Sequence, residues 1–253
     1  MTVKFHADTS GFFDDLDELK ARLDAARPLP SHTLASLREQ LALEWTYHSN
    51  AIEGNTLTLR ETQVVLEGIT VGGKPLKDHL EAINHRDAIR YVMSLVERRQ
   101  TLSERSILDI HSLVLKGIDD RQAGRYRQQN VIITGASTRP SHFLHVRDNL
   151  QNLLAWHDSA PAQALHPIER EAQMHARFEQ IHPFVDGNGR TGRLLLNLEL
   201  MKYGYPPAVI QKENRMEYYE ALDTAATSKD YRPVTRLVAG AVKRSLDLYL
   251  SIM

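Results

Sequence analysis

Residues 182–193 read HPFVDGNGRTGR and separate two stretches whose apolar residues recur with helical spacing. In the stretch before them, Met174, Phe178 and Ile181 repeat at i, i+4 and i+7, which predicts a helix that buries one face. The stretch that follows, residues 194–201, is apolar on more than one face. Because a helix that lacks a polar face is buried, we expect this one to lie at the centre of an all-α domain.

The other apolar repeats extend the helical prediction to almost the whole chain. Leu37, Leu41, Trp45 and Ile52 lie on one stripe of a helix, and Gly54 is suited to end it. Capping residues and apolar spacing predict further helices over residues 58–68, 78–99, 103–117, 146–156, 167–181, 191–203, 213–226 and 233–251.

One short segment departs from the helical pattern. The run VIIT at residues 131–134 is β-branched throughout and favours an extended backbone. Turn residues follow it, and residues 142–146 are a candidate return strand. We therefore expect a small β-hairpin at about residues 131–146, placed on the helical body.

The composition excludes several classes of protein. The 253 residues carry 31 Lys and Arg against 32 Asp and Glu, so the chain lacks the excess positive charge that nucleic-acid binding requires. Cysteine is absent, which excludes disulfides, thiolate metal sites and a cysteine nucleophile. No apolar run approaches the ~18 residues of a membrane span, and residues 1–15 lack the apolar stretch of a signal peptide. We expect a cytoplasmic protein that binds neither nucleic acid nor a membrane.

The glycine-rich loop at residues 182–193 has the features of an anion site. A loop that enters a buried helix presents free backbone N–H groups and the positive end of the helix dipole. Arg190 and Arg193 lie on one face of the first turn, where cations are unfavourable unless an anion is bound. His182 supplies a proton acceptor that is neutral near pH 7, and Asp186 supplies an oxygen ligand suited to Mg²⁺.

The same twelve residues match, at every specified position, the signature H-x-F-x-[D/E]-G-N-G-R-x-x-R of the Fic family. The similarity runs from about residue 37 to residue 250. The chain resembles most the Fic adenylyltransferases of the animal endoplasmic reticulum, without their membrane and repeat segments. The resemblance implies the Fic fold, a helical bundle with a small β-hairpin flap, and transfer of AMP from ATP to a Ser, Thr or Tyr hydroxyl of a target protein, with release of pyrophosphate.

The resemblance also implies a role for each residue of the motif. His182 would deprotonate the target hydroxyl, and Asp186 would hold Mg²⁺ between the α- and β-phosphates of ATP. Arg190 would contact the β-phosphate and Arg193 the γ-phosphate. The other residues expected to contact ATP are Gly187, Asn188, Gly189, Thr191 and Gly192 of the loop, Thr134, Gly135, Ala136 and Ser137 of the flap, and Tyr218 and Tyr219 on the adenine side.

The flap and residue 226 refine this interpretation. An exposed flap edge can pair with an extended target segment through backbone hydrogen bonds, which positions the target hydroxyl with little dependence on the target sequence. Close relatives carry an Asn to the nucleotide seven residues after the second tyrosine, and this chain departs from them with Ala226.

A second motif lies near the predicted end of the helix over residues 37–52. Ser49, Glu53 and Gly54 match the inhibitory motif [S/T]-x-x-x-E-[G/N] of the family. A carboxylate at a helix C-terminus is unfavourable without a partner cation, and Arg193 is the obvious partner. If the two side chains pair, the γ-phosphate loses its ligand. We therefore expect an N-terminal helical extension at 1–100 with the inhibitory motif at 49–55, and a catalytic domain at 101–253.

Several alternatives stay open at this point. The same residues would serve removal of AMP from modified proteins, with Glu53 positioning a water molecule. A Doc-like kinase is disfavoured, because Gly189 keeps room beside the phosphates where that branch carries a Lys. A non-catalytic nucleotide sensor would not need His182. Residues 73–76 resemble the segment through which close relatives pair, which predicts a weak homodimer through Leu76.

Overall fold

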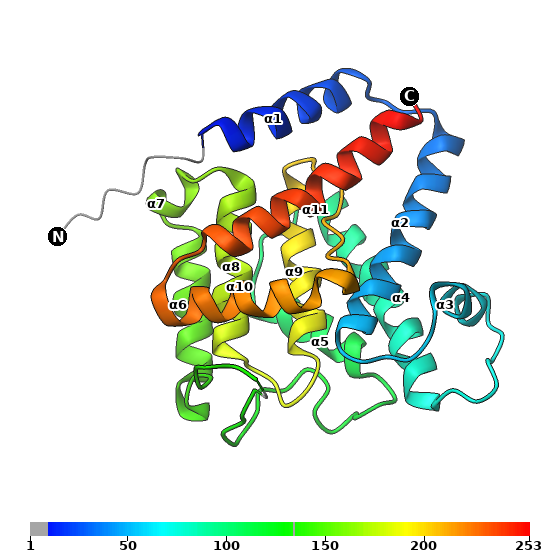
Figure 1. The fold of residues 1–253 in the computed structure, drawn as a ribbon. Helices are drawn as coiled ribbons and strands as arrows, with labels where there is room; N and C mark the ends of the chain where they lie inside the picture. Colours follow the sequence, from blue (N-terminus) through cyan, green and yellow to red (C-terminus); the bar gives the residue numbers. More distant parts are fainter. Residues whose placement is uncertain (1–9, 134) are drawn as a thin grey trace.

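The computed structural model describes residues 10–133 and 135–253, and these residues form a helical bundle (Figure 1). Thr134, one of the predicted flap contacts, lies outside the described residues. The α-helices are α1 Ser10–Ala25, α2 Ser31–Ile52, α3 Leu59–Leu66, α4 Leu76–Glu97, α5 Glu104–Leu115, α6 Val146–His157, α7 Ala160–Gln163, α8 Pro167–Ile181, α9 Asn188–Lys202, α10 Arg215–Ser228 and α11 Arg232–Ser251, with short 3-10 helices η1 Phe143–His145 and η2 Lys212–Asn214.

Helix α9 lies at the centre of the bundle, as its apolar sequence predicts (Figure 1). It packs against α8, α4, α5 and α2. Leu194, Leu196 and Leu200 are completely buried, and so is the polar Asn197. The loop at residues 182–193 is therefore held at the junction of α8 and α9, the two helices that pack most extensively against each other.

The N-terminal third of the chain packs onto the same core. One continuous apolar cluster contains Phe13 of α1 and Trp45 of α2 together with Leu196 of α9 and Val242 of α11. The boundary that we predict at residue 100 therefore does not separate two cores. In the described ranges, no helix combines the length and the apolar character needed to cross a membrane.

Local capping signals are found where the sequence indicates them. The Thr58 hydroxyl accepts from the backbone N–H of Glu61, and the Glu61 carboxylate accepts from the N–H of Thr58, which together begin α3. At the end of α2, Gly54 adopts the left-handed conformation with φ of +97°. The N–H of Asn55 then bonds to the carbonyl of Asn50, which closes the helix at Glu53.

The β-hairpin predicted at residues 131–146 is not seen in the described residues of this segment. Residues 131–133 and 135–142 have irregular structure, and Phe143–His145 forms a 3-10 helix. The side chain of Ile132 is 86% exposed. Because the described part of the chain contains no strand, Val131, Ile132 and Ile133 have no ladder in which their intrinsic β preference could be realised. Side chains hold the loop instead: Asp223 of α10 accepts from the N–H of Ser137, and Asn130 accepts from the N–H of Phe143.

Candidate active site

His182 terminates α8 and leads directly into the loop. Its φ of 50° is in the left-handed region, which is unfavourable for a residue other than glycine, so the surroundings must hold it. Arg127, almost completely buried, does this by donating from Nε to the carbonyl of His182 at 2.7 Å and from Nη2 to the carbonyl of Ile181 at 3.3 Å. The backbone N–H of Arg127 also donates to the carbonyl of Pro183.

The loop after His182 is closed by its own side chains. Asn188 accepts from the N–H of Phe184 and donates to its carbonyl, both at 2.9 Å. The ring of Phe184 is completely buried and stacks on His111 with centroids 3.5 Å apart. Gly187 has φ of +78°, and a Cβ there would lie 3.2 Å from Val114 and 3.4 Å from His111. Phe184 therefore anchors the loop, and Gly187 lets it pass close to α5.

The electrostatics favour a neutral imidazole at His182. Burial lowers the pKa of His182 to about 4, opposed by the carbonyl of Glu179 and reinforced by the charge of Arg127. At pH 7 the ring is consequently unprotonated and able to accept a proton. The carboxylate of Asp186 is ionised: burial alone would raise its pKa, but Arg190, the N–H of Gly187 and Lys77 lower it overall.

Arg190 and Asp186 are paired in this conformation. Arg190 contacts Glu81 of α4 at 3.0 Å and Asp186 at 3.3 Å. The side chain of Asp186 is 51% exposed and has Lys77 at 3.6 Å on its other side. An exposed, ionised carboxylate at the start of α9 fits a hard cation such as Mg²⁺. Because it now faces two cations, these would have to share it or move when the metal binds.

The side chain of Arg193 binds residues at the C-terminal end of α2. Its guanidinium donates from Nη2 to Glu53 Oε1 and to the carbonyl of Ser49, both at 2.7 Å, and from Nε to the Ser49 hydroxyl at 3.0 Å. We call Glu53 and Arg193 the inhibitory pair, after the role that the sequence predicts for them. Arg193 is almost completely buried, whereas the side chain of Glu53 is 31% exposed. Burial would lower the pKa of Arg193, but Glu53 raises it overall. The structure thus brings both predicted partners together.

The two tyrosines that are predicted to lie on the adenine side of ATP have different environments. Tyr218 is 1% exposed, and its hydroxyl bonds to His175 Nε2 at 2.7 Å and contacts Arg193 Nη1 at 3.5 Å. Tyr219 is 36% exposed, with the Arg215 guanidinium 5.4 Å from its ring centroid. Its hydroxyl donates to the carbonyl of Ile52 at 3.2 Å. Tyr219 therefore presents a ring face that could stack on a base, whereas Tyr218 helps to hold Arg193.

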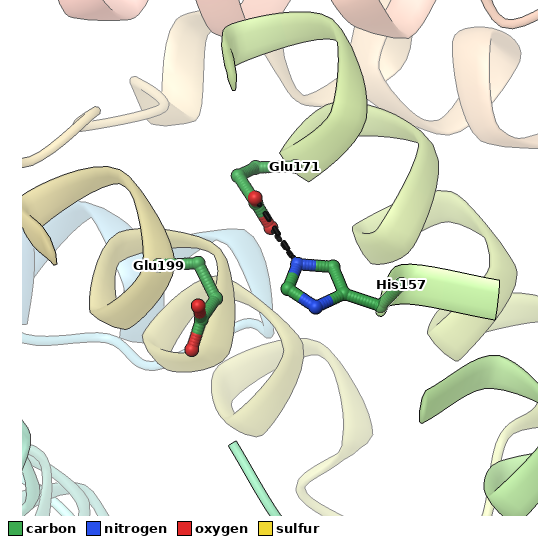
Figure 2. Close-up of side chains that lie close together, drawn as sticks. All are labelled: His157, Glu171 and Glu199. Atoms are coloured by element: carbon green, nitrogen blue, oxygen red, sulfur yellow. Dashed lines mark hydrogen bonds and ion pairs between the residues drawn. The ribbon is translucent and has the colours of Figure 1, made fainter. Parts of the chain in front are cut away.

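Figure 2 shows a second group of titratable residues, His157, Glu171 and Glu199, whose ligand atoms lie within 4.8 Å of one another. Each carboxylate already forms an ion pair with a basic side chain: Arg170 contacts Glu171 at 2.8 Å, and Lys202 contacts Glu199 at 2.6 Å. The charges balance when His157 is neutral, so a divalent cation would add uncompensated buried charge. We interpret the group as an ion-pair network that joins α6, α8 and α9.

Sequence reasoning missed several residues that shape the site. Arg127 carries no local signal, because it lies far from the loop in the sequence. Glu179 does carry a local signal in the sequence. His175, Glu179 and His182 recur at i, i+4 and i+7, so a polar stripe runs beside the apolar stripe of α8.

Comparisons with known proteins show which proteins this chain is similar to. A sequence profile described as the Fic/DOC family matches residues 101–200. The chain is 37% identical over 240 residues to the protein adenylyltransferase Fic of Nematostella vectensis, covering 93% of this chain and 56% of that protein. The structure of Fic-1 from C. elegans superposes with a TM-score of 0.86 at 34% identity, covering 95% of this chain and 71% of that one. A Fic domain containing signaling protein from Bacteroides thetaiotaomicron gives a TM-score of 0.85 at 30% identity, covering 94% and 96%. The chain spans about half the length of the curated relatives it matches.

Proposed function

This chain belongs to the Fic family, and from that premise we propose that it is an autoinhibited protein adenylyltransferase that moves AMP from ATP to a hydroxyl of a target protein. The observation that carries the proposal is the junction of α8 and α9. There a neutral imidazole, an ionised carboxylate and the N-terminus of a buried helix meet, and the helix carries an arginine that α2 occupies. The relatives named adenylyltransferases supply the reaction class.

Each group has a chemical role in this proposal. His182 accepts the proton of the target hydroxyl, whose oxygen then attacks the α-phosphorus while pyrophosphate leaves. The N–H groups of the first turn of α9 and the side chains of Arg190 and Arg193 bind phosphate oxygens. Asp186 would hold Mg²⁺, which when bound neutralises charge on the phosphates. Arg190 must exchange Glu81 and Asp186 for a phosphate oxygen, and Arg193 must exchange Glu53.

Labelled ATP distinguishes this reaction from its rivals. With the Glu53→Gly variant and Mg²⁺, label from α-³²P-ATP should appear on protein, including the enzyme itself, whereas label from γ-³²P-ATP should not. Transfer of the γ-label would indicate a kinase. Failure of both labels to transfer, although ATP binds, would favour the nucleotide sensor. Release of AMP from a modified protein without net transfer would favour the reverse, hydrolytic activity.

We also propose a weak homodimer through Leu76. This residue begins α4 and is 72% exposed, and the preceding turn presents it outward. Isolated apolar residues are common on protein surfaces, so the proposal depends on its resemblance to the pairing segment of relatives. In sedimentation velocity at rising concentration, the wild type should shift towards dimer and Leu76→Asp should stay monomeric. Equal monomer masses for both proteins would contradict the proposal.

A further inference from the structure

Glu179 is a half-buried residue whose carboxyl group lies beside the first turns of α9, and the proposed reaction does not use it. It lies on α8, three residues before His182. Its Oε1 is buried and has no hydrogen-bond partner among the described residues. A Cβ placed on Gly192 would lie only 2.2 Å from this oxygen, so the carboxyl group rests against the backbone of α9. An unpartnered buried carboxyl oxygen is costly, which calls for a physical explanation.

The carboxyl group of Glu53 lies against the same helix in the same manner. A Cβ placed on Gly189 would lie 2.2 Å from Glu53 Oε1 and 2.9 Å from Arg193 Nη1. Gly189 and Gly192 are three residues apart and thus share one face of α9. Two carboxyl groups therefore flank the turn from which Arg193 emerges, and in this conformation Glu53 holds the guanidinium.

The charges around Glu179 explain how the two carboxyl groups coexist. Burial raises the pKa of Glu179 to about 8, Arg193 lowers it and Glu53 raises it, so the group is protonated at neutral pH. Three other titratable groups near this region, among the residues that the structure describes, are uncharged at neutral pH. The pKa of His175 on α8 is lowered to about 3 by burial and that of His182 to about 4, whereas burial raises the pKa of Tyr218 on α10. Glu53 and Arg193 are thus the charges to which Glu179 responds.

We propose that Glu179 is a positioning residue for Arg193: it is protonated while Glu53 holds the guanidinium, and it becomes the anion that pairs with the guanidinium when Glu53 leaves. The inference rests on the proposed function, because it concerns the arginine assigned to the γ-phosphate. The proton passes to water, which reaches the site as the partly exposed side chain of Glu53 moves out. When the γ-phosphate takes Arg193, Glu179 accepts a proton again.

This arrangement has different consequences with and without Glu53. With Glu53 present, Glu179 is protonated both before and after ATP binds, so it lowers the cost of the step in which Glu53 leaves Arg193 but does not change the Kd of ATP. With Glu53 removed, ionised Glu179 competes with the γ-phosphate for the same guanidinium. A purely structural carboxyl group would have the same effect in both backgrounds.

The test measures the Kd of Mg-ATP by calorimetry, without a target protein, in wild type, Glu179→Gln, Glu53→Gly and the double variant. Glutamine imitates the protonated carboxyl group in shape and charge. We expect Glu179→Gln to leave the Kd of ATP within about twofold in the wild-type background and to lower it about three- to tenfold in the Glu53→Gly background, which corresponds to a shift of up to about one pKa unit. Glu169→Gln, the same change near the start of α8, is the matched control and should alter neither. The same change of Kd in both backgrounds, or no change in the Glu53→Gly background, would overturn the proposal.

A second measurement needs no nucleotide. Carboxyl-¹³C-glutamate NMR should show Glu179 titrating near pH 8 in the wild type and at least about one unit lower in Glu53→Gly, because Arg193 then acts on it alone. Glu179→Gln assigns the resonance, or Glu179→Asp if the glutamine variant does not fold. The same titration range in both proteins would refute the inference even if the enzyme transfers AMP. Conversely, the expected titration without any AMP transfer would leave Glu179 coupled to Arg193 and would reject the proposed function.

Discussion

Replacement of His182 by asparagine is expected to lower the rate of AMP transfer by a factor of about 10²–10⁴, the usual contribution of a general base. The imidazole is the proton acceptor at the junction of α8 and α9 and is neutral at pH 7, since burial lowers its pKa to about 4. Asparagine tolerates the left-handed conformation that this position requires, with φ of 50°, so the loop should keep its shape. Alanine should give the same loss with some cost in stability.

The affinity for ATP separates a catalytic from a structural effect in this experiment. Because His182 acts on the target hydroxyl, the Kd of Mg-ATP should stay within about twofold of wild type, which is a change of well under 1 kcal/mol. His32→Ala, which changes an exposed histidine of α2, is the matched control and should keep full transfer. Label transfer at the wild-type rate by His182→Asn would reject the general-base role.

The pH profile of transfer provides an independent check on the same residue. A base whose pKa is about 4 is fully unprotonated from pH 6 to pH 8, so the rate should lack an acidic limb near the ordinary histidine pKa of ~6.5. The limb should instead appear as the pH falls towards 4.

The elements that the sequence predicts best are those whose local and tertiary preferences agree. The predicted helix over residues 167–181 coincides with α8, because its apolar stripe, its first-turn proline and the turn after it all favour the same boundaries. The contact between Glu53 and Arg193 follows from two charges that each oppose a helix dipole and relieve one another when they meet. Its inhibitory role stays a prediction.

The failures have equally specific causes. The run at 131–134 has an intrinsic β preference, but a strand exists only where a neighbouring edge offers hydrogen bonds. Arg127 holds the His182 backbone from 55 residues away, and nothing local to an arginine reveals which carbonyls it will contact. Glu179 lay on a visible stripe, but its significance depends on Gly192 and Arg193 across the helix interface, which only the packing of α8 on α9 establishes.

Replacement of Glu53 by glycine should raise the initial rate of AMP transfer, including self-modification, by about two orders of magnitude. In the resting conformation Glu53 binds the guanidinium of Arg193, with Nη2 of Arg193 2.7 Å from Glu53 Oε1. The γ-phosphate must bind the same guanidinium. Glycine removes the competing carboxylate, and the backbone at this position, φ −84° and ψ 0°, accepts it without strain. Loss of one partner of a partly buried pair is worth about 3 kcal/mol, and each 1.4 kcal/mol is a tenfold change in productive ATP binding.

Stability should change in a way that identifies the cause. Without Glu53, Arg193 of the ATP-free protein pairs with Glu179, which is a less favourable partner. The unfolding temperature of Glu53→Gly should therefore fall. Saturating Mg-ATP should then raise the unfolding temperature more in Glu53→Gly than in the wild type, because a ligand that binds more tightly stabilises the folded state further at equal concentration. Differential scanning fluorimetry with and without Mg-ATP measures both effects.

Arg193→Ala is the decisive companion variant, because it also breaks the inhibitory pair. Simple loosening of α2 would activate the enzyme in both variants. Competition for the guanidinium activates only Glu53→Gly, since Arg193→Ala removes the γ-phosphate ligand together with the partner of Glu53. We therefore expect Arg193→Ala to stay at or below the wild-type rate. Activation by both variants would show that α2 restrains the site by its position rather than by its carboxylate, and an unchanged rate in Glu53→Gly would leave the 2.7 Å contact a structural ion pair.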